Sequence, residues 1–333
     1  MEEKTMKNLL AVALAAMLLT GCAALPGEER SFAVVLGLDW QNGSWHAGAR
    51  IPTYKNGGEY ATVTAEGTSL GEALGMLNAA APMELHYGQL RLLVLSEALA
   101  ETQPVPELFK ALAERGEVRP QAAVCVTVEK MKDLLDAMEP STGSRLSKSV
   151  EAMLQARQDQ GVLPECTLSS LIRMGERQHA VLLNAELDDK AVQLSGGWMT
   201  NGHGVTGSLT KTETQLLSLL MGRLKQGTLA LESGTVTLLD TDCSIRLKGN
   251  AAHCMVRLRY GASTMTEEGV RQAITAALQG MTAKLANAGC DALGLGRQAM
   301  LACADMTAWR ELNWPERYPS LEWIFDIRME REA

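Results

Sequence analysis

The chain has 333 residues, of which 46% are hydrophobic and 21% charged, and its formal net charge at pH 7 is −8. This length is enough for two or three domains. A mildly acidic chain without a basic cluster is not expected to bind nucleic acid, or to bind anionic lipid by electrostatic attraction alone.

The N-terminus has the layout of a secretory signal peptide. Lys7 precedes an apolar run from Leu9 to Leu19, and small residues then lead to Cys22. At about 1.5 Å per residue this run reaches about half of a ~30 Å hydrocarbon core, so a permanent transmembrane helix is disfavoured. We therefore expect export. Two glutamates follow Met1, which fits a signal poorly, so Met6 is an alternative start.

The end of this signal resembles the bacterial lipobox. In Leu19-Thr20-Gly21-Cys22 the cysteine would receive a diacylglyceryl group, and the signal would be cut just before it. Two acyl chains hold a protein at a membrane more stably than one, because each buried methylene contributes about 0.8 kcal/mol. We predict a signal peptide at 1–21, lipid attachment at Cys22 and a short tether at 22–30. An ordinary signal with a cysteine nearby by chance is the alternative.

Six more cysteines follow, and none forms a CxxC pair or has a histidine at zinc-site spacing. A structural metal is therefore not expected. Several lie in apolar runs, which favours buried thiols, with one or two disulfides as the alternative in an exported protein. They are Cys125, Cys166, Cys243, Cys254, Cys290 and Cys303.

The first half alternates β-rich runs with helices. Apolar runs on both sides of Asn42-Gly43 predict a hairpin. Ser69 followed by Glu72 predicts a capping box, in which Glu72 reaches back to the backbone N–H of the cap residue. Strands are expected at 31–40, 45–54, 60–65, 89–95, 121–128, 179–187 and 191–199, and helices at 69–82, 96–100, 106–115, 129–138, 147–158 and 167–174. This alternation predicts helices packed on a sheet.

A turn cluster, Asn201-Gly202-His203-Gly204, is the best candidate for a domain boundary, which we place near residue 200. The alternating runs at 253–260 and 321–329 predict strands with one buried face. In this half helices are expected at 212–224, 265–288 and 294–306, and strands at 228–231, 234–239, 244–247, 253–260 and 321–329.

One catalytic pattern occurs in the chain. Gly67-Thr68-Ser69-Leu70-Gly71 matches the G-x-S-x-G nucleophile elbow of α/β-hydrolases, and it lies between a predicted strand and a predicted helix. Only about three strands precede it, however, and no HGGG-type oxyanion segment is present. Ser69 is already the predicted helix cap, so a structural role is favoured over catalysis.

The other candidate residues also have simpler structural explanations. Gly294–Ala299 fits a loose G-x-G-x-x-A dinucleotide loop, but a helix precedes it instead of a strand. His203 is interpreted as a solvated turn residue and His86 as a structural residue at a strand start. The acidic pairs Asp188-Asp189 and Glu267-Glu268 are interpreted as turn and helix-start charges. We expect no enzyme activity, catalytic residue, metal or cofactor.

Four segments in the two halves form a recognisable set. Gly67–Leu74 is a glycine-led helix start with Glu-Ala, and Gly88–Ala100 is an apolar strand with a Glu-to-Ala ending. Asp291–Gly296 is an Asp-x-x-Gly-x-Gly turn, and Trp314–Tyr318 runs from Trp to an aromatic residue. Together they resemble the Ger(x)C family, the lipoprotein C subunits of nutrient germinant receptors in endospore-forming bacteria. The resemblance covers nearly the whole mature chain.

The chain departs from the family at two positions: Gln89 replaces the usual histidine and Tyr318 the usual phenylalanine. No functional residue is transferred except the lipidated Cys22. The resemblance implies an α+β fold of mixed or antiparallel sheets flanked by helices, in two to three domains. Its parts would be an N-terminal germinant-receptor region at 31–200, of one or two subdomains, and a C-terminal α+β domain at 201–333.

The function implied by the resemblance is that of a non-enzymatic receptor subunit. Such a protein would sit on the outer face of the spore inner membrane, and would work with a membrane-embedded A subunit and a multi-spanning B subunit. Two alternatives from other classes stay open. A lipid-anchored solute-binding protein of a transporter should show two similar α/β lobes around a cleft, and a surface hydrolase would need Ser69 as its nucleophile.

Overall fold

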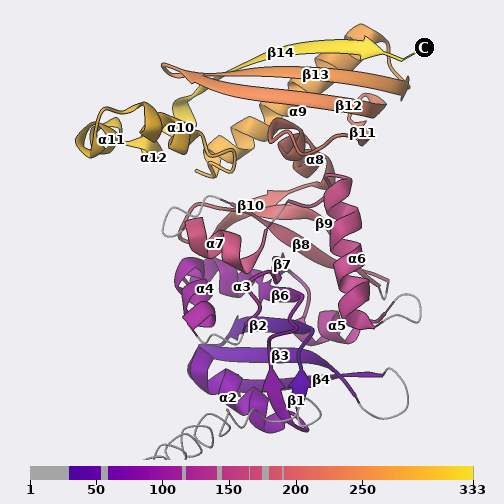
Figure 1. The fold of residues 1–333 in the computed structure, drawn as a ribbon, viewed down its shortest axis with the longest axis vertical. Coiled ribbons are helices and arrows are strands. Elements are labelled where there is room, and N and C mark those ends of the chain that lie inside the picture. Colours follow the sequence, from indigo (N-terminus) through magenta and orange to yellow (C-terminus); the bar gives the residue numbers. More distant parts are fainter. Residues whose placement is uncertain are drawn as a thin grey trace, which may run out of the picture.

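The structure is a computed structural model that describes residues 30–53, 59–114, 118–140, 145–164, 166–174, 180–189 and 191–332. The predicted lipid site Cys22 and nearly all of the tether lie outside these described residues. Figure 1 shows the strands of the first half of the chain at one end of the long axis and the last four strands at the other.

The secondary structure confirms most of the predicted elements. The strands are β1 (Arg30–Phe32), β2 (Val35–Gln41), β3 (Ser44–Pro52), β4 (Tyr60–Gly67), β5 (Glu84–His86), β6 (Leu92–Ser96), β7 (Ala123–Thr127), β8 (Val181–Asp188), β9 (Ala191–Thr200), β10 (Val205–Leu209), β11 (Gly227–Leu231), β12 (Gly234–Lys248), β13 (Ala251–Ser263) and β14 (Glu322–Arg331). The helices are α2 (Leu70–Ala80), α3 (Glu97–Thr102), α4 (Val105–Glu114), α5 (Met131–Asp136), α6 (Leu146–Asp159), α7 (Leu168–Met174), α8 (Lys211–Leu220), α9 (Glu267–Asn287), α10 (Leu295–Ala302), α11 (Met306–Leu312) and α12 (Trp314–Arg317), followed by the short 3-10 helix η3 (Tyr318–Ser320).

Eight strands form a large mixed sheet in the order β10-β9-β8-β7-β6-β2-β3-β4. Its central strands β8, β7, β6 and β2 pair in parallel. The strands on both flanks pair antiparallel. Strands β6 and β7 are buried along their whole length, as expected for parallel strands covered on both faces. That burial explains why both appear in the sequence as unbroken apolar runs.

The predicted hairpin between β2 and β3 is confirmed. Its turn residues Asn42 and Gly43 have φ values of 52° and 80°. Positive φ at both central positions is typical of a tight hairpin turn whose twist matches that of the strands. The pairing continues from Gln41 opposite Ser44 to Val35 opposite Arg50.

A second sheet of four strands, in the order β11-β12-β13-β14, is antiparallel except for its last pair. Helix α9 covers one face of this sheet with its buried residues, as its apolar stripe predicts. This stripe consists of Val270, Ile274, Leu278, Met281 and Leu285. The two sheets with their helices confirm the α+β class.

Some predicted elements differ from the structure. The strand expected at 31–40 is two strands, because β1 pairs with β5 in a separate two-stranded sheet whereas β2 belongs to the large sheet. The strands expected at 234–239 and 244–247 are one strand, β12, whose register against β13 shifts on either side of Leu238. Such irregularities break the period of two that marks a strand in sequence. The single helix expected at 294–306 is two helices, because the Asp305 carboxylate accepts the N–H groups of Thr307 and Ala308 and so begins α11.

The two sheets are joined by a continuous apolar core. Val181, Met199 and Leu209 of the large sheet belong to the same buried cluster as Leu216 and Leu220 of α8. Strand β10, beyond residue 200, is the edge of the large sheet. The division of the chain into domains near residue 200 stays a prediction.

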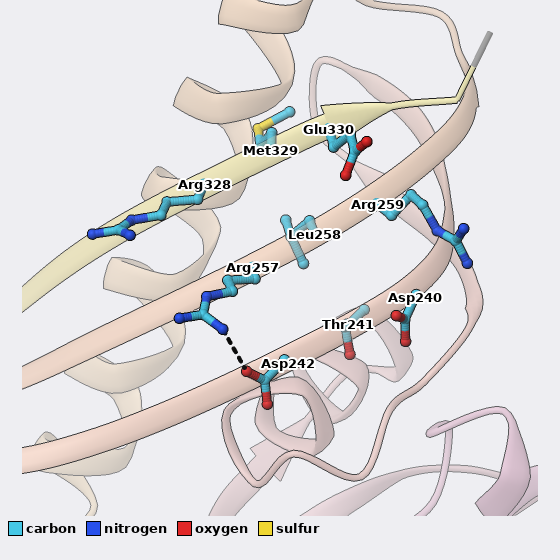
Figure 2. Close-up of a pocket in the computed structure, with 9 residues that line it drawn as sticks. All are labelled: Asp240, Thr241, Asp242, Arg257, Leu258, Arg259, Arg328, Met329 and Glu330. Atoms are coloured by element: carbon cyan, nitrogen blue, oxygen red, sulfur yellow. Dashed lines mark ion pairs between the residues drawn. The ribbon is translucent and has the colours of Figure 1, made fainter.

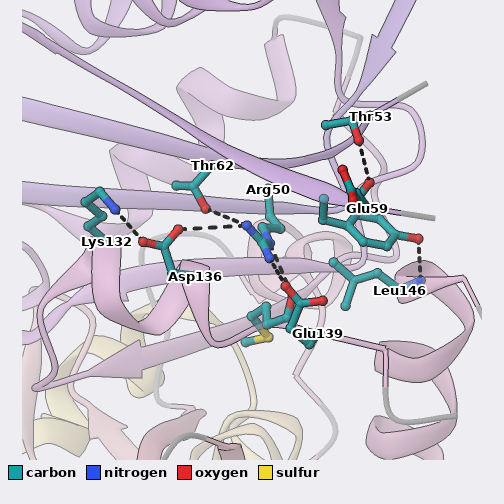
Figure 3. Close-up of polar contacts among 10 residues, drawn as sticks. Arg50, Thr53, Glu59, Thr62, Lys132, Asp136, Glu139 and Leu146 are labelled. Carbon is teal, nitrogen blue, oxygen red and sulfur yellow. Dashed lines mark hydrogen bonds and ion pairs between the residues drawn. The ribbon is translucent and has the colours of Figure 1, made fainter. Parts of the chain in front are cut away.

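Arg50 on β3 forms a buried polar cluster within the N-terminal part (Figure 3). Its side chain is 5% exposed. Its guanidinium donates to the carbonyl of Met138 at 3.2 Å, to Thr62 Oγ1 at 3.1 Å and to the Glu139 carboxylate. The Asp136 carboxylate lies 3.8 Å from it. These contacts join the sheet to the end of α5, which makes the cluster structural.

Candidate functional site

The G-x-S-x-G pattern is a helix start. A Cβ added at Gly67 would lie 2.4 Å from the backbone nitrogen of Ala73, so only glycine permits this close approach. Ser69 Oγ accepts the N–H of Glu72 at 3.2 Å and is the N-cap of α2. The predicted capping box is wrong in one detail. The Glu72 carboxylate accepts from the N–H and hydroxyl of Thr68, one residue before the cap.

The histidines singled out in the sequence have local roles. His86 Nδ1 accepts the N–H of Gly88 at 3.1 Å, and its ring meets Phe32 edge-on at 5.7 Å between centroids. His203 is exposed in the turn after β9, where its N–H donates to Asn201 Oδ1 at 3.2 Å. Neither contact gathers a second titratable side chain around the imidazole.

The acidic pairs are also local. The carboxylate of Asp188 accepts from the Gln193 side chain across the hairpin of β8 and β9. Glu267 and Glu268 both pair with Arg271, about one turn further along α9, at 3.5 and 3.4 Å. Across the described residues, no three His, Cys, Asp or Glu side chains gather where they could hold a metal ion.

The family-like segments of the C-terminal half meet around one buried carboxylate. Asp291 Oδ1 accepts the N–H of Leu295 at 2.9 Å, and Oδ2 accepts the N–H of Gly296 at 2.6 Å and the indole Nε1–H of Trp314 at 3.1 Å. The Tyr318 hydroxyl donates to the carbonyl of Cys290 at 2.9 Å, and burial raises the pKa of Tyr318. This arrangement begins α10 and fixes the aromatic residues, so Gly294–Ala299 is not a dinucleotide loop.

The six cysteines after the signal are all free thiols. Burial raises the pKa of Cys166, Cys254 and Cys290 to about 12 and that of Cys243 to about 11. Thiols with such values are almost fully protonated at neutral pH, which makes them poor nucleophiles. These four thiols therefore offer no reactive site.

The candidate functional site is the outer face of the four-stranded sheet, opposite α9. Three neighbouring residues from each of β12, β13 and β14 line a hollow of about 630 Å³ (Figure 2). They are Asp240, Thr241, Asp242, Arg257, Leu258, Arg259, Arg328, Met329 and Glu330. The strand register places acidic and basic residues in rows across this surface.

The charged side chains on this face form solvent-exposed ion pairs. Arg257 pairs with Asp242 at 3.6 Å, and both side chains are about two-thirds exposed. Arg328 lies beside Arg257 in the register and pairs with Asp326 at 3.0 Å. Exposed ion pairs contribute about 0–1 kcal/mol each, so these groups can exchange one partner for another at little cost. Chemically, the face is suited to polar contacts with another macromolecule.

The described residues do not show the geometry expected of a solute-binding protein or of a hydrolase. A solute-binding protein should show two similar lobes, whereas the described residues form an eight-stranded, a four-stranded and a two-stranded sheet of different topology. A hydrolase would need a free Ser69, whose hydroxyl here caps α2. Among the described residues, no helix has the length and apolar character needed to cross a membrane.

Comparison with known proteins finds a matching family and a solved structure of the same fold. Residues 26–184 match the family described as "Spore germination protein N-terminal domain". A solved structure titled "Crystal Structure of the GerBC protein" has the same fold, with a TM-score of 0.55 at 12% identity over 90% of this chain and 97% of that chain. None of the curated proteins matches the chain significantly.

The N-terminal part of this chain is therefore a spore germination protein domain. This match agrees with the resemblance to the Ger(x)C family seen in the sequence motifs, and the shared fold extends over the rest of the chain.

Proposed function

We propose that this protein is a lipid-anchored, non-enzymatic C subunit of a spore nutrient germinant receptor. The observation that carries the proposal is the match of residues 26–184 to the spore germination domain. The site geometry supports it, because the catalytic-looking patterns are used as helix starts and turns. In this account the chain acts through protein contacts.

The membrane attachment is proposed to rest on Cys22. The lipobox supplies the thiol, and the diacylglyceryl group would hold the protein on the outer face of the spore inner membrane. The tether 22–30 would connect the anchor to β1, followed by an N-terminal region at 31–200 and a C-terminal domain at 201–333.

The proposed partners are the membrane-embedded A and B subunits of the receptor. Loosely paired charges on the outer face of the C-terminal sheet make it the candidate contact surface. Arg257→Glu combined with Arg328→Glu would reverse two neighbouring charges there without changing a buried group. Lys110→Glu, at an exposed position on α4, is the matched control for charge alone.

A germination assay in spores tests the function. Spores that carry Cys22→Ala as the only copy of the protein, in a strain without a redundant paralogue, should lose the nutrient response that depends on this receptor. Mass spectrometry of the N-terminal peptide should show the diacylglyceryl group on Cys22 in the wild type. Normal nutrient-triggered germination after deletion of the gene would refute the proposal.

A further inference from the structure

The described residues carry an exposed apolar tip formed by α10 and α11, residues 295–312. Leu301 at the end of α10 is 74% exposed and Met306 at the start of α11 is 51% exposed. Ala302 and Ala304 between them are also exposed. Exposed apolar groups gathered in this way usually mark an interaction site. Figure 1 shows this tip projecting sideways from the long axis of the molecule.

Hydrogen bonds to Asp291 and stacking of tryptophan rings fix the helices of the tip. The Asp291 carboxylate fixes the first turn of α10 and the indole of Trp314. Trp314 in turn stacks on Trp309 of α11, with 6.4 Å between ring centroids. Leu301 and Met306 are therefore presented by preorganised helices, which lowers the entropy lost on binding.

The position of the tip argues against its insertion into the lipid bilayer. The described chain begins at Arg30, at the end of the long axis opposite the four-stranded sheet (Figure 1). From Cys22 to Arg30 the chain has 30 − 22 = 8 steps and spans at most about 28 Å. If Cys22 is anchored as proposed above, the membrane lies beyond the N-terminal end and the tip lies in the distal part of the molecule.

The charges around the tip favour a second copy of this chain. The segment 295–312 carries two exposed cations, Arg297 and Arg310, and two exposed anions, Asp305 and Glu311. A balanced rim of this kind gives no net attraction to an anionic surface. A twofold axis lets the cations of one copy face the anions of the other while the apolar centres meet.

We propose that this tip is a self-association surface, at which two copies pack Leu301 and Met306 against each other about a twofold axis parallel to the long axis. Because the tip projects sideways, this symmetry leaves both N-termini at the same end. Both lipid anchors can then enter one membrane. The proposal goes beyond the receptor-subunit function and uses only its anchor.

Cross-linking of the full-length lipidated protein in spore membranes tests the proposal. Leu301→Cys, treated with a short bis-maleimide, should give an adduct that mass spectrometry identifies as two copies of this chain. Val128→Cys, at a 62% exposed position in the N-terminal part, is the matched control and should not. Both variants are made in a Cys303→Ser background, since Cys303 in the tip is partly exposed and could itself cross-link. Adding Met306→Asp to Leu301→Cys should lower the adduct yield about tenfold.

Three results would overturn the proposal: an adduct yield no higher than that of Cys303→Ser alone, an equal yield from Val128→Cys, or an adduct that contains a different protein. Loss of the protein from the membrane fraction would instead refute the lipid anchor on which the orientation rests. A germination defect without loss of the Leu301→Cys adduct would leave the self-association standing, so the two proposals fail separately.

Discussion

At the scale of the residue, Asp291 combines three local functions in one buried carboxylate. It accepts two backbone N–H groups at the start of α10 and one indole N–H from Trp314. Each of these donors would be left unsatisfied without the carboxylate. The family-like motif around it is therefore structural, and it fixes the tip formed by α10 and α11.

Asp291→Asn should destabilise the protein by about 2 kcal/mol, because the amide NH2 would face a buried donor in place of an acceptor. The midpoint of urea unfolding measures the change. Asp305→Asn is the matched control, since asparagine caps an exposed helix about as well as aspartate. Equal midpoints for the two variants would contradict the assigned role of Asp291.

Arg50→Met should cost about 3 kcal/mol, because the Met138 carbonyl and the Glu139 carboxylate would both lose a buried partner. Lys132→Met changes an exposed ion pair at the edge of the same cluster and should cost less than about 1 kcal/mol. Urea unfolding of both variants provides the comparison. The cluster would be energetically unimportant if Arg50→Met unfolded at the midpoint of the wild type.

Glu213 is expected to make the stability depend on pH. Burial alone would raise the pKa of its carboxyl, but the Thr210 N–H at 2.7 Å and Lys284 Nζ at 2.9 Å outweigh burial and lower it below 4.5. A lowered pKa in the folded state adds stability above pH 4.5 that is lost as the pH falls through the folded-state pKa.

The loss of unfolding free energy between about pH 6 and about pH 3 should therefore be smaller in Glu213→Gln than in the wild type. Lys284→Met should reduce it in the same direction, because it removes the cation that lowers the pKa. Unfolding by urea at both pH values measures the difference. A variant with the full loss of the wild type would show that this carboxyl does not contribute.

At the scale of the element, two helical glycines are in opposite environments. A Cβ added at Gly296 in α10 would lie 2.6 Å from Trp314 Nε1, whereas one added at Gly280 in α9 would meet nothing within 4 Å. Gly296→Ala should destabilise the protein by about 2 kcal/mol through overpacking. Gly280→Ala should stabilise it by about 1 kcal/mol, since alanine favours the helix. Thermal unfolding of both variants should give shifts of opposite sign.

Elements with an unbroken pattern could be predicted from the sequence. The stripe of α9 and the hairpin at Asn42-Gly43 are both confirmed. Strand β12 could not be predicted whole, because its register shifts near Leu238 break the alternation. Strand β5, of three residues, has too little pattern to stand out from a loop.

The candidate site and the Asp291 cluster could not be predicted from local sequence patterns, because both depend on contacts between residues far apart in the chain. The contact between Asp291 and Trp314 joins residues 23 positions apart, and only the fold brings them together. The rows of charge on the outer sheet face depend on the register between strands β12, β13 and β14. Alternation predicts which residues point outward, but it does not predict which of them are neighbours.

At the scale of the whole molecule, the two sheets are joined by close packing. Gly161, after α6, has a φ of 65°, and a Cβ there would lie 2.7 Å from Leu224 Cδ1. Ser218 Oγ of α8 donates to its carbonyl at 3.1 Å. With the apolar cluster around Val181 and Leu220, this contact makes the N-terminal and C-terminal parts one packed body.

The most direct test of the receptor-subunit function is a pull-down of the natively lipidated protein from spore membranes, with Cys22→Ala as the control. The account predicts that mass spectrometry will identify a multi-spanning membrane subunit and a second receptor subunit, and that both will be lost with Cys22→Ala. Recovery of a transporter permease and its ATPase instead would contradict the receptor function and favour a solute-binding protein.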